Sequence, residues 1–227
     1  KEILSKSGDK EYGRYMSNFC HLHVHSHYSL LDGLASPVEL ADKAAELGQK
    51  SLALTDHGSM HGAIDFYISC KERGIKPIIG YEAYVAPSSR YDKAAKKGEI
   101  TYNHLTLLAK NIEGYHNLIQ LSTKAFTEGF YYKPRIDMEL LKLHSAGVIC
   151  LSGCIYSKFS IDILSDPLHM DERKYIQQMT EIFPDSGFYI ECQDHGLPEQ
   201  KKYKEYISTS SLYSCVVATN DVHYIEQ

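Results

Sequence analysis

Residues 21–33 read HLHVHSHYSLLDG and bring four histidines and one aspartate into a short stretch that ends at a turn. Its first half alternates histidine with other residues, which is typical of a β-strand whose alternate side chains share a face. His23 and His25 would therefore point the same way, with Asp32 a few residues further on. A single histidine is usually a surface or hydrogen-bonded core residue, but paired imidazoles near a carboxylate indicate half of a metal site.

The length of 227 residues fits one domain, or one large α/β unit, that can bury a substantial core. We expect residues 1–17 to be an N-terminal extension or linker and residues 18–227 to form the domain. No apolar stretch approaches the length of a membrane span, and the polar N-terminal residues lack the apolar segment of a signal peptide. The sequence therefore predicts a soluble, cytoplasmic chain without membrane contact.

The formal net charge is −5, and the six cysteines form no CxxC pair. A protein that binds nucleic acid mainly by neutralising phosphates is normally basic, so any DNA contact should be local or should depend on a partner domain. The cysteines are too sparse for a disulfide scaffold. Reduced thiols are therefore expected, and these remain free to bind metal.

Strand-like and helix-like patterns alternate along the rest of the chain. A helix should begin at Pro37, behind a serine N-cap and a capping box, and end at Gly48. Further helices are expected over residues 61–73 and 115–126. The expected strands cover residues 19–25, 51–55, 76–82, 104–109, 148–151, 188–191 and 216–219.

Seven strands with helical crossovers favour a closed α/β barrel over an open sheet. In such barrels the functional groups lie at the carboxyl ends of the strands, and here polar residues end or follow most of them. His104 is the exception because it opens its strand. Residues 87–102 before it contain no helix pattern, so the chain is expected to return antiparallel and to start at the same rim.

The predicted rim carries five histidines, three carboxylates and one thiol. This is more than one tetrahedral or octahedral ion can use as ligands. We therefore expect two or three divalent metal ions. Clustered ions with bridging carboxylates are typical of phosphoryl chemistry, where they support the attacking hydroxide and the leaving oxygen.

Eight segments, taken in chain order, carry a resemblance to a known family. They are HLHVHSHYSLLDG, ALTDHGSMHGAIDFY, KPIIGYEAYV, HLTLLAKNIEGYHNL, EGFYYKPRID, LSGC, HGLPEQ and VATNDVHY. In these segments the sequence resembles the polymerase and histidinol phosphatase (PHP) domain at the N-terminus of the bacterial replicative DNA polymerase III α subunit. The resemblance implies a distorted (β/α)7 TIM-like barrel of the PHP type. It also implies a chain that lacks the later helices and polymerase domains of full-length relatives.

The resemblance further implies nine metal ligands, one at each matching position. They are His23, His25, Asp32, His57, Glu82, His104, Cys154, Asp221 and His223. It implies a trinuclear centre, usually of zinc, manganese or iron, and a 3′ to 5′ exonuclease that removes misincorporated nucleotides. All nine positions carry a coordinating residue type, which favours activity. The implied partners are the 3′ end of a DNA primer, the remaining domains of the polymerase and the replisome subunits.

The mechanistic hypothesis divides the ligands between ions. Metal held by one set would lower the pKa of a bound water and generate hydroxide, and a second ion would stabilise the leaving 3′ oxygen. The first set is His23, His25, Glu82, Cys154 and Asp221, and the second is Asp32, His57, His104 and His223.

Asp32, His57, Glu82 and His195 are the predicted catalytic residues, with His195 reaching the rim as a substrate or proton-transfer residue. Asp56 is expected to orient a ligand without binding metal itself. Two basic residues, Arg135 and Lys133, are candidates for contact with substrate phosphate. A solvated surface pair is the alternative interpretation of these two residues.

Two other functional hypotheses stay open. The domain could be a structural metal module that braces the polymerase without turnover, or a free-standing phosphatase acting on a small phosphomonoester. The complete ligand set argues against the structural module. The polymerase-type segments GYEAYV and HGLPEQ argue against the phosphatase.

Overall fold

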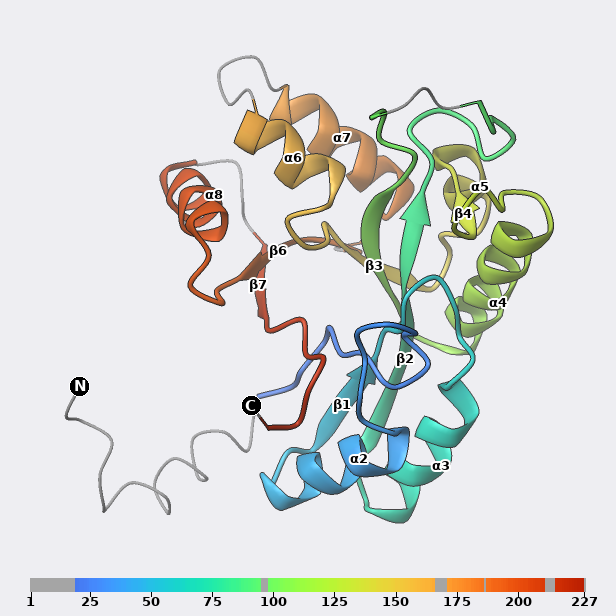
Figure 1. Cartoon of the computed structure of the whole chain (residues 1–227), viewed down its shortest axis with the longest axis vertical. Coiled ribbons are helices and arrows are strands. Elements are labelled where there is room, and N and C mark those ends of the chain that lie inside the picture. The colour runs from blue at the N-terminus through green and yellow to red at the C-terminus, as the bar shows by residue number, and fades with distance from the viewer. Residues whose placement is uncertain (1–18, 95–97, 166–170, 186, 211–214, 227) are drawn as a thin grey trace.

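A curled sheet runs through the middle of the molecule, and helices cover its outer side (Figure 1). The structure is a computed structural model that describes residues 19–94, 98–165, 171–185, 187–210 and 215–226. The strands are β1 (Ser51–Leu54), β2 (Lys76–Val85), β3 (Asn103–Ala109), β4 (Arg135–Ile136), β5 (Val148–Leu151), β6 (Phe188–Gln193) and β7 (Val216–Thr219). They are ordered β1-β2-β3-β5-β6-β7, and the short β4 pairs with β2. The predicted extension, residues 1–17, thus lies entirely outside the described residues.

The helices follow the strands as the crossover pattern predicts. They are α2 (Pro37–Glu46), α3 (Ala63–Glu72), α4 (Ile112–Thr127), α5 (Met138–Leu143), α6 (Lys158–Ser165), α7 (Glu172–Ile182) and α8 (Pro198–Thr209). At the start of α2, the Ser36 side chain accepts a hydrogen bond from the Glu39 backbone, and the Glu39 carboxylate accepts one from the Ser36 backbone. This is the predicted capping box, which satisfies backbone donors that a helix end leaves unpaired.

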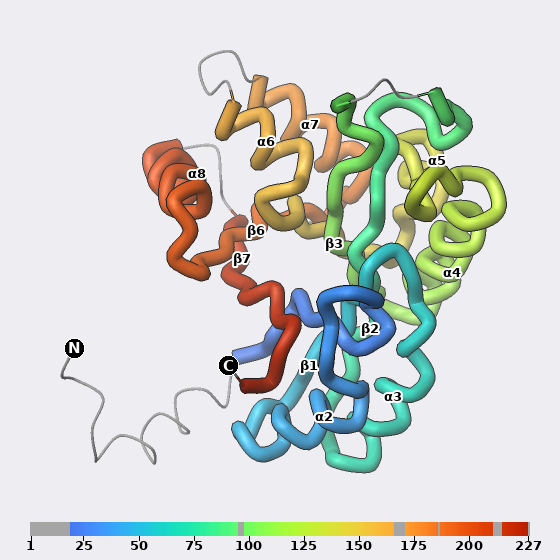
Figure 2. Tube along the Cα trace, viewed as in Figure 1, coloured from blue at the N-terminus to red at the C-terminus, as the bar shows by residue number. Residues whose placement is uncertain are grey.

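The N-terminal and C-terminal segments close the ring of strands. Val24 and Val222 form an isolated parallel bridge, and the His25 N–H donates to the Val222 carbonyl at 2.7 Å. On the other side, the Thr55 N–H donates to the Val24 carbonyl at 2.8 Å. Figure 2 shows these two ends of the described chain side by side. Residues 19–25 therefore take the predicted place of a first strand, although their pairing is limited to a bridge and a few hydrogen bonds.

β2 and β3 form an antiparallel pair, as expected from the absence of a helix between them. Tyr84 lies opposite His104, so the first residues of β3 sit at the same end of the sheet as the last residues of β2. β2 runs to Val85, beyond the predicted end, because its last residues also pair with β4. With β3 antiparallel and the remaining neighbours parallel, the sheet is the distorted barrel that the resemblance implies.

The apolar core consists of separate clusters along the sheet. The larger cluster lies between the sheet and α4 to α8 and includes Leu107, Leu118 and Phe159, which are fully buried. A second cluster packs α2 and α3 against β1. Burying such side chains is the main favourable contribution to folding. This packing stabilises the curvature of the sheet, which brings the carboxyl ends of the strands close to one another.

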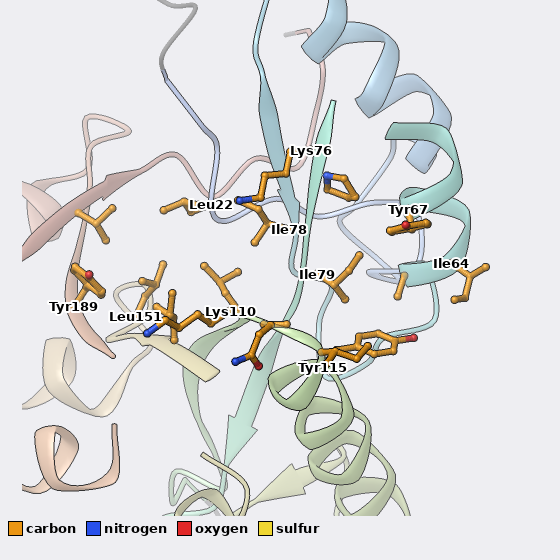
Figure 3. Close-up of a pocket in the computed structure, with 18 residues that line it drawn as sticks. Leu22, Ile64, Tyr67, Lys76, Ile78, Ile79, Lys110, Tyr115, Leu151 and Tyr189 are labelled. Atoms are coloured by element: carbon orange, nitrogen blue, oxygen red, sulfur yellow. The ribbon is translucent and has the colours of Figure 1, made fainter. Parts of the chain in front are cut away.

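An apolar pocket of about 780 Å³ lies beside the opening residues of β2 and the closing residues of β3 (Figure 3). Its polar lining comes mainly from Lys76, Lys110 and Asn111. None of its described lining residues is histidine, cysteine, aspartate or glutamate. The pocket is thus separate from the predicted metal ligands.

Two general expectations can be compared with the structure. All six cysteines are described and none is in a disulfide, in agreement with the expected reduced thiols. Within the described ranges, no helix combines the length and the apolar character needed to cross a membrane.

Replacing Leu118 by alanine should lower the free energy of unfolding by about 2–5 kcal/mol, because it leaves a cavity between α4 and the sheet. Ile112 on the same helix is 68% exposed, so Ile112→Ala should change this free energy by no more than about 0.5 kcal/mol. Urea unfolding followed by circular dichroism measures both. Similar losses for the two variants would contradict the assignment of the buried face of α4.

Candidate metal centre

All nine predicted ligands lie at one rim of the sheet. His23 and His25 belong to the closing segment and Asp32 to the loop after it. The others lie in or shortly after strands. They are His57 after β1, Glu82 in β2, His104 at the start of β3, Cys154 after β5, and Asp221 and His223 after β7. Segments from both ends of the chain therefore contribute to one cluster of side chains.

Three groups within this cluster could each hold a metal ion. They are His23, His25 and Asp221; His25, His57 and His223; and Glu82, His104 and Cys154. In each group the potential ligand atoms lie within 4.8 Å of one another. Because His25 belongs to two groups, the candidate sites are contiguous. The grouping differs from the hypothetical division between ions, which had placed Glu82 and Cys154 with His23.

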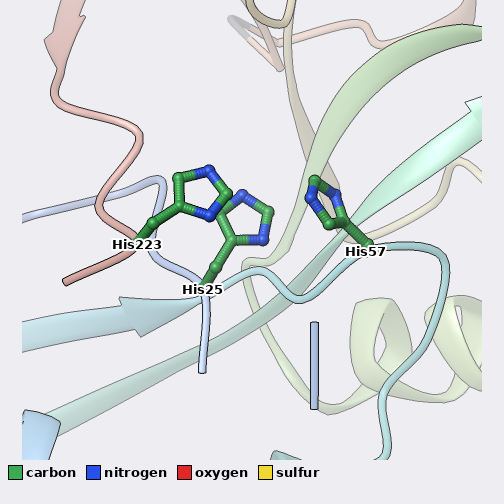
Figure 4. A group of neighbouring side chains, drawn as sticks. All are labelled: His25, His57 and His223. Atoms are coloured by element: carbon green, nitrogen blue, oxygen red, sulfur yellow. The ribbon is translucent and has the colours of Figure 1, made fainter. Parts of the chain in front are cut away.

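Three histidines from distant segments face one another, as Figure 4 shows. The rings of His25 and His223 are stacked with centroids 4.3 Å apart. The His57 ring lies 4.2 Å from that of His25, tilted by 41°. Imidazole rings that converge in this way can direct nitrogen lone pairs at a common ion.

Asp221 lies where three imidazoles meet. Its Oδ1 is 3.1 Å from Nε2 of His25 and 3.3 Å from Nε2 of both His23 and His223. Oδ1 and the Nε2 atoms of His23 and His25 are buried without a hydrogen-bond partner. Buried polar atoms normally have hydrogen-bond partners, and a site built for an ion is one reason for an exception. This donor set therefore fits a cation.

The Glu82 carboxylate is buried and connects the groups. Its Oε2 is 2.5 Å from Nδ1 of His57, and its Oε1 is 2.8 Å from Nδ1 of His104. Oε1 is also 3.5 Å from Nε2 of His23 and 3.7 Å from Sγ of Cys154. Burial alone would raise the pKa of Glu82, but His104 and the other imidazoles hold it well below its usual range. Glu82 is thus an ionised carboxylate with two oxygens available for bridging.

Glu191 orients His23 from behind. Its Oε1 lies 2.6 Å from Nδ1 of His23, while its Oε2 accepts a hydrogen bond from the Thr106 hydroxyl at 3.0 Å. Thr219 also donates to Glu191. If Nδ1 of His23 carries the proton that Glu191 accepts, its Nε2 is left free to bind metal. The sequence spacing could not identify Thr106 and Thr219 as partners of Glu191.

Asp56 has the orienting role that was expected of it, acting through Ser29. The Ser29 hydroxyl donates to Oδ1 of Asp56 at 2.8 Å, so its oxygen accepts from the His57 N–H at 3.0 Å. The same oxygen is 2.9 Å from Nδ1 of His25, which must then be the protonated nitrogen of that ring. Nε2 of His25 consequently points at Asp221 as an acceptor. The importance of Ser29 was not visible in the sequence pattern.

Of the nine predicted ligands, Asp32 has the most exposed side chain. The side chain is 48% exposed, and its Oδ2 is 3.1 Å from Nε2 of His57. Its Oδ1 is 3.8 Å from Nδ1 of His223. Asp32 therefore reaches the His25, His57 and His223 group from the solvent side.

Arg135 is placed in a structural environment. Its guanidinium is buried and donates to the carbonyls of Gly129, Thr101, Arg90 and Asp92. These four bonds use four of the five N–H groups of an arginine. The placement favours a role in holding the loops around β4 over the predicted phosphate contact.

Lys133 lies near the cluster. Its Nζ is 5.4 Å from the centroid of the Tyr84 ring, a cation–π distance. The Tyr84 ring is itself 5.2 Å from that of His104 and 6.1 Å from that of His57. A lysine in this position can approach a phosphate bound at the rim.

His195 is exposed, and both of its ring nitrogens have partners. Nε2 donates to the carbonyl of Asn220, and Nδ1 is 2.9 Å from Nε2 of Gln200. Asn220 directly precedes Asp221, so His195 anchors the loop that carries this predicted ligand. The geometry supports a positioning role for His195, and its catalytic role stays a prediction.

Comparison with known proteins gives a family model and several relatives. The model of the PHP domain matches residues 21–195. DNA polymerase III subunit alpha of Treponema pallidum is 47% identical over 212 residues, and that of Thermus aquaticus is 47% identical over 214 residues. Each alignment covers 92% of this chain but only 18% and 17% of the relatives. The chain thus spans less than a fifth of these proteins.

Two solved structures share the fold at low sequence identity. One is a candidate metal-dependent phosphoesterase from Bifidobacterium adolescentis, with a TM-score of 0.56, 11% identity, and coverage of 93% of this chain and 90% of that one. The other is a two-domain protein from Bacteroides vulgatus that contains a predicted PHP-like metal-dependent phosphoesterase. Its TM-score is 0.50 at 14% identity, with coverage of 90% of this chain and 51% of that one.

The buried position of Arg135 and the more exposed position of Lys133 predict different effects of mutation on the free energy of unfolding. Arg135→Ala should lower the free energy of unfolding by about 2 kcal/mol or more, because it leaves buried carbonyls without donors. Lys133→Ala should change it by at most about 0.5 kcal/mol, as expected for a half-buried surface lysine. Chemical unfolding of both variants decides the matter, and a neutral Arg135→Ala would restore this residue as a candidate for phosphate contact.

Proposed function

The chain belongs to the PHP domain family, and from this premise we propose that it is the metal-dependent phosphoesterase domain of a DNA polymerase III alpha-type protein, acting as a 3′ to 5′ exonuclease. The observation that carries the proposal is the convergence of three contiguous groups of potential ligands at one rim, with buried imidazole nitrogens that lack protein partners. Proofreading of a primer end requires this kind of hydrolytic site.

The residues fit two or three divalent ions of zinc, manganese or iron. The donor set mixes imidazole nitrogens, carboxylate oxygens and one thiol, and all three ligand types are used by such ions. Burial and the nearby carboxylates raise the pKa of Cys154 well above its usual value. Cys154 would thus be a neutral thiol unless a cation stabilised the thiolate. A metal-free role for Cys154 offers no comparable reason for its contact with Glu82 and His104.

We assign the nine ligands and the reacting groups as follows. His23, His25, His57, His104, His223, Cys154, Asp32, Glu82 and Asp221 would hold the ions. Bound divalent ions supply a nucleophile from water near neutral pH and neutralise charge on a phosphodiester.

Glu82 would keep the groups at a fixed separation through its two oxygens, as its contacts with His57 and His104 suggest. The exposed Asp32 would meet the substrate side, next to His57. His195 would support catalysis by fixing the loop before Asp221.

The proposed substrate is the 3′ end of a DNA primer, with Lys133 contacting its phosphate. The net charge of −5 fits a domain that relies on neighbours for most of its DNA affinity. The polymerase relatives extend far beyond the matched region. We therefore propose the other domains of such a polymerase, and its replisome subunits, as partners.

The substrate class is tested by offering the purified chain a mismatched primer end and a small phosphomonoester, each with Mn²⁺ or Zn²⁺. We expect release of nucleotides from DNA, at least 100-fold slower in Asp32→Asn and abolished by chelation. Asp42→Asn removes a carboxylate of the same type that is 60% exposed and pairs with Arg73 instead, so it should retain full activity.

The other outcomes of this assay point to other functions. A sample that contains metal by elemental analysis but cleaves neither compound would overturn the exonuclease and favour a structural metal module. Phosphate released only from the small compound would identify a phosphomonoesterase.

Metal affinity tests the orienting role of Glu191. Glu191→Gln should weaken binding of the first equivalents of Zn²⁺ by about 10- to 100-fold, because it removes the charged acceptor for Nδ1 of His23. Titration against a chromophoric chelator measures this without any substrate. Glu205→Gln changes an exposed glutamate on α8 and should bind metal like the unmodified chain. Unchanged affinity in Glu191→Gln would contradict the assignment of His23 as a ligand.

A further inference from the structure

We propose that Tyr156 and Tyr102 form a stacking platform for the unpaired base of the terminal nucleotide. This proposal rests on the proposed function and specifies its substrate as a single-stranded 3′ end. This pair is called the tyrosine platform below. Both rings lie next to the predicted ligand His104. The His104 ring centroid is 5.8 Å from that of Tyr102 and 5.9 Å from that of Tyr156.

The backbone fixes Tyr156 against the site. The turn after β5 brings the Tyr156 carbonyl within 3.3 Å of the His104 N–H, which donates to it. Gly153 in the same turn has φ of +88°, and a Cβ there would lie 2.8 Å from the His104 carbonyl. Only glycine accepts this backbone conformation and close approach without strain. Tyr156 is therefore held at a fixed distance from the metal-ligand cluster.

The side chain of Tyr156 is nevertheless left open. It is 64% exposed, although tyrosine normally buries most of its ring. Tyr102, by contrast, is half-buried, with its ring edge-on to Tyr84 at 4.7 Å and within 20° of parallel to the His104 ring. One ring of the pair is thus anchored and the other is available for a partner.

The chemistry of a nucleotide suits this arrangement. In a nucleic acid, each base lies one sugar away from its phosphate. If the terminal phosphodiester lies at the group of Glu82, His104 and Cys154, the base of the terminal nucleotide would lie beside the two tyrosine rings next to His104. Stacking on aromatic side chains binds every base, because each has a π-face, and is typical of proteins that bind single strands.

A base can stack on the platform only after it has left its pair. Unpairing costs least for a mismatched end, so a platform of this kind favours mismatched ends without reading their sequence. Lys133 lies over the Tyr84 ring, which neighbours His104, and would add an ionic contact to the strand. The platform thus links the geometry of the rim to the selection of misincorporated nucleotides.

The test measures binding rather than turnover. A fluorescent single-stranded oligonucleotide with a hydrolysis-resistant phosphorothioate at its last linkage is titrated with the whole chain in Mn²⁺ and followed by anisotropy. A second oligonucleotide replaces the last nucleotide by an abasic one. The variants are Tyr156→Ala, Tyr156→Phe, and Tyr67→Ala, which removes a tyrosine of α3 that is 47% exposed and lines the separate apolar pocket.

We expect Tyr156→Ala to weaken binding of the base-bearing end by about tenfold, and Tyr156→Phe and Tyr67→Ala to leave it within twofold. On the abasic oligonucleotide, Tyr156→Ala should bind like the unmodified chain, since no base remains to stack. The proposal is overturned if Tyr156→Ala weakens both ends equally, if phenylalanine fails to restore binding, or if no oligonucleotide binds. Hydrolysis of an unmodified strand is measured separately. Base-dependent binding without hydrolysis would refute the exonuclease and leave the platform standing.

Discussion

The buried carboxylate of Glu82 is the constraint on which the rest of this rim depends. A negative charge taken out of water is costly unless close opposite charges or hydrogen-bond donors compensate it. Here the compensation comes from imidazoles on two other segments, those of His57 and His104. Each of these segments must be held in place by the sheet before the carboxylate is satisfied. The barrel fold and the ligand cluster therefore depend on each other.

The antiparallel return of β3 solves a problem of placement. In a purely parallel barrel, the first residue of a strand lies at the opposite end from the last residues of its neighbours. By reversing direction after β2, the chain brings His104 to the rim where Glu82 lies. The absence of a helix from the described residues between β2 and β3 thus places His104 beside Glu82, as the sequence indicated. Local patterns of this kind allowed the prediction of most elements, including β5 and β7 at their observed bounds.

Sequence reasoning is limited where a residue's role depends on partners far along the chain. β4 has only two residues, and their pairing with Tyr84 and Val85 carries no periodic signal. Arg135 has the residue type of a phosphate ligand, but its guanidinium donates to four backbone carbonyls, three of them more than 30 residues away in the sequence. His195 likewise has the residue type of a catalytic acid, although its nitrogens are used to hold a loop. Residue type and spacing identify candidates for the cluster, whereas burial and the direction of each donor decide what they contact.

The closure of the ring by its first and last segments also affects how the molecule folds. His23 meets Glu191 across 168 residues of sequence, and the bridge from Val24 to Val222 spans a still longer loop. Contacts of such high sequence separation form slowly, because the entropy of closing the intervening loop is lost before they become stabilising. During synthesis on the ribosome, the earliest histidines must wait for nearly the whole domain to emerge. Ions held by the complete cluster would therefore be captured late in the maturation of this protein.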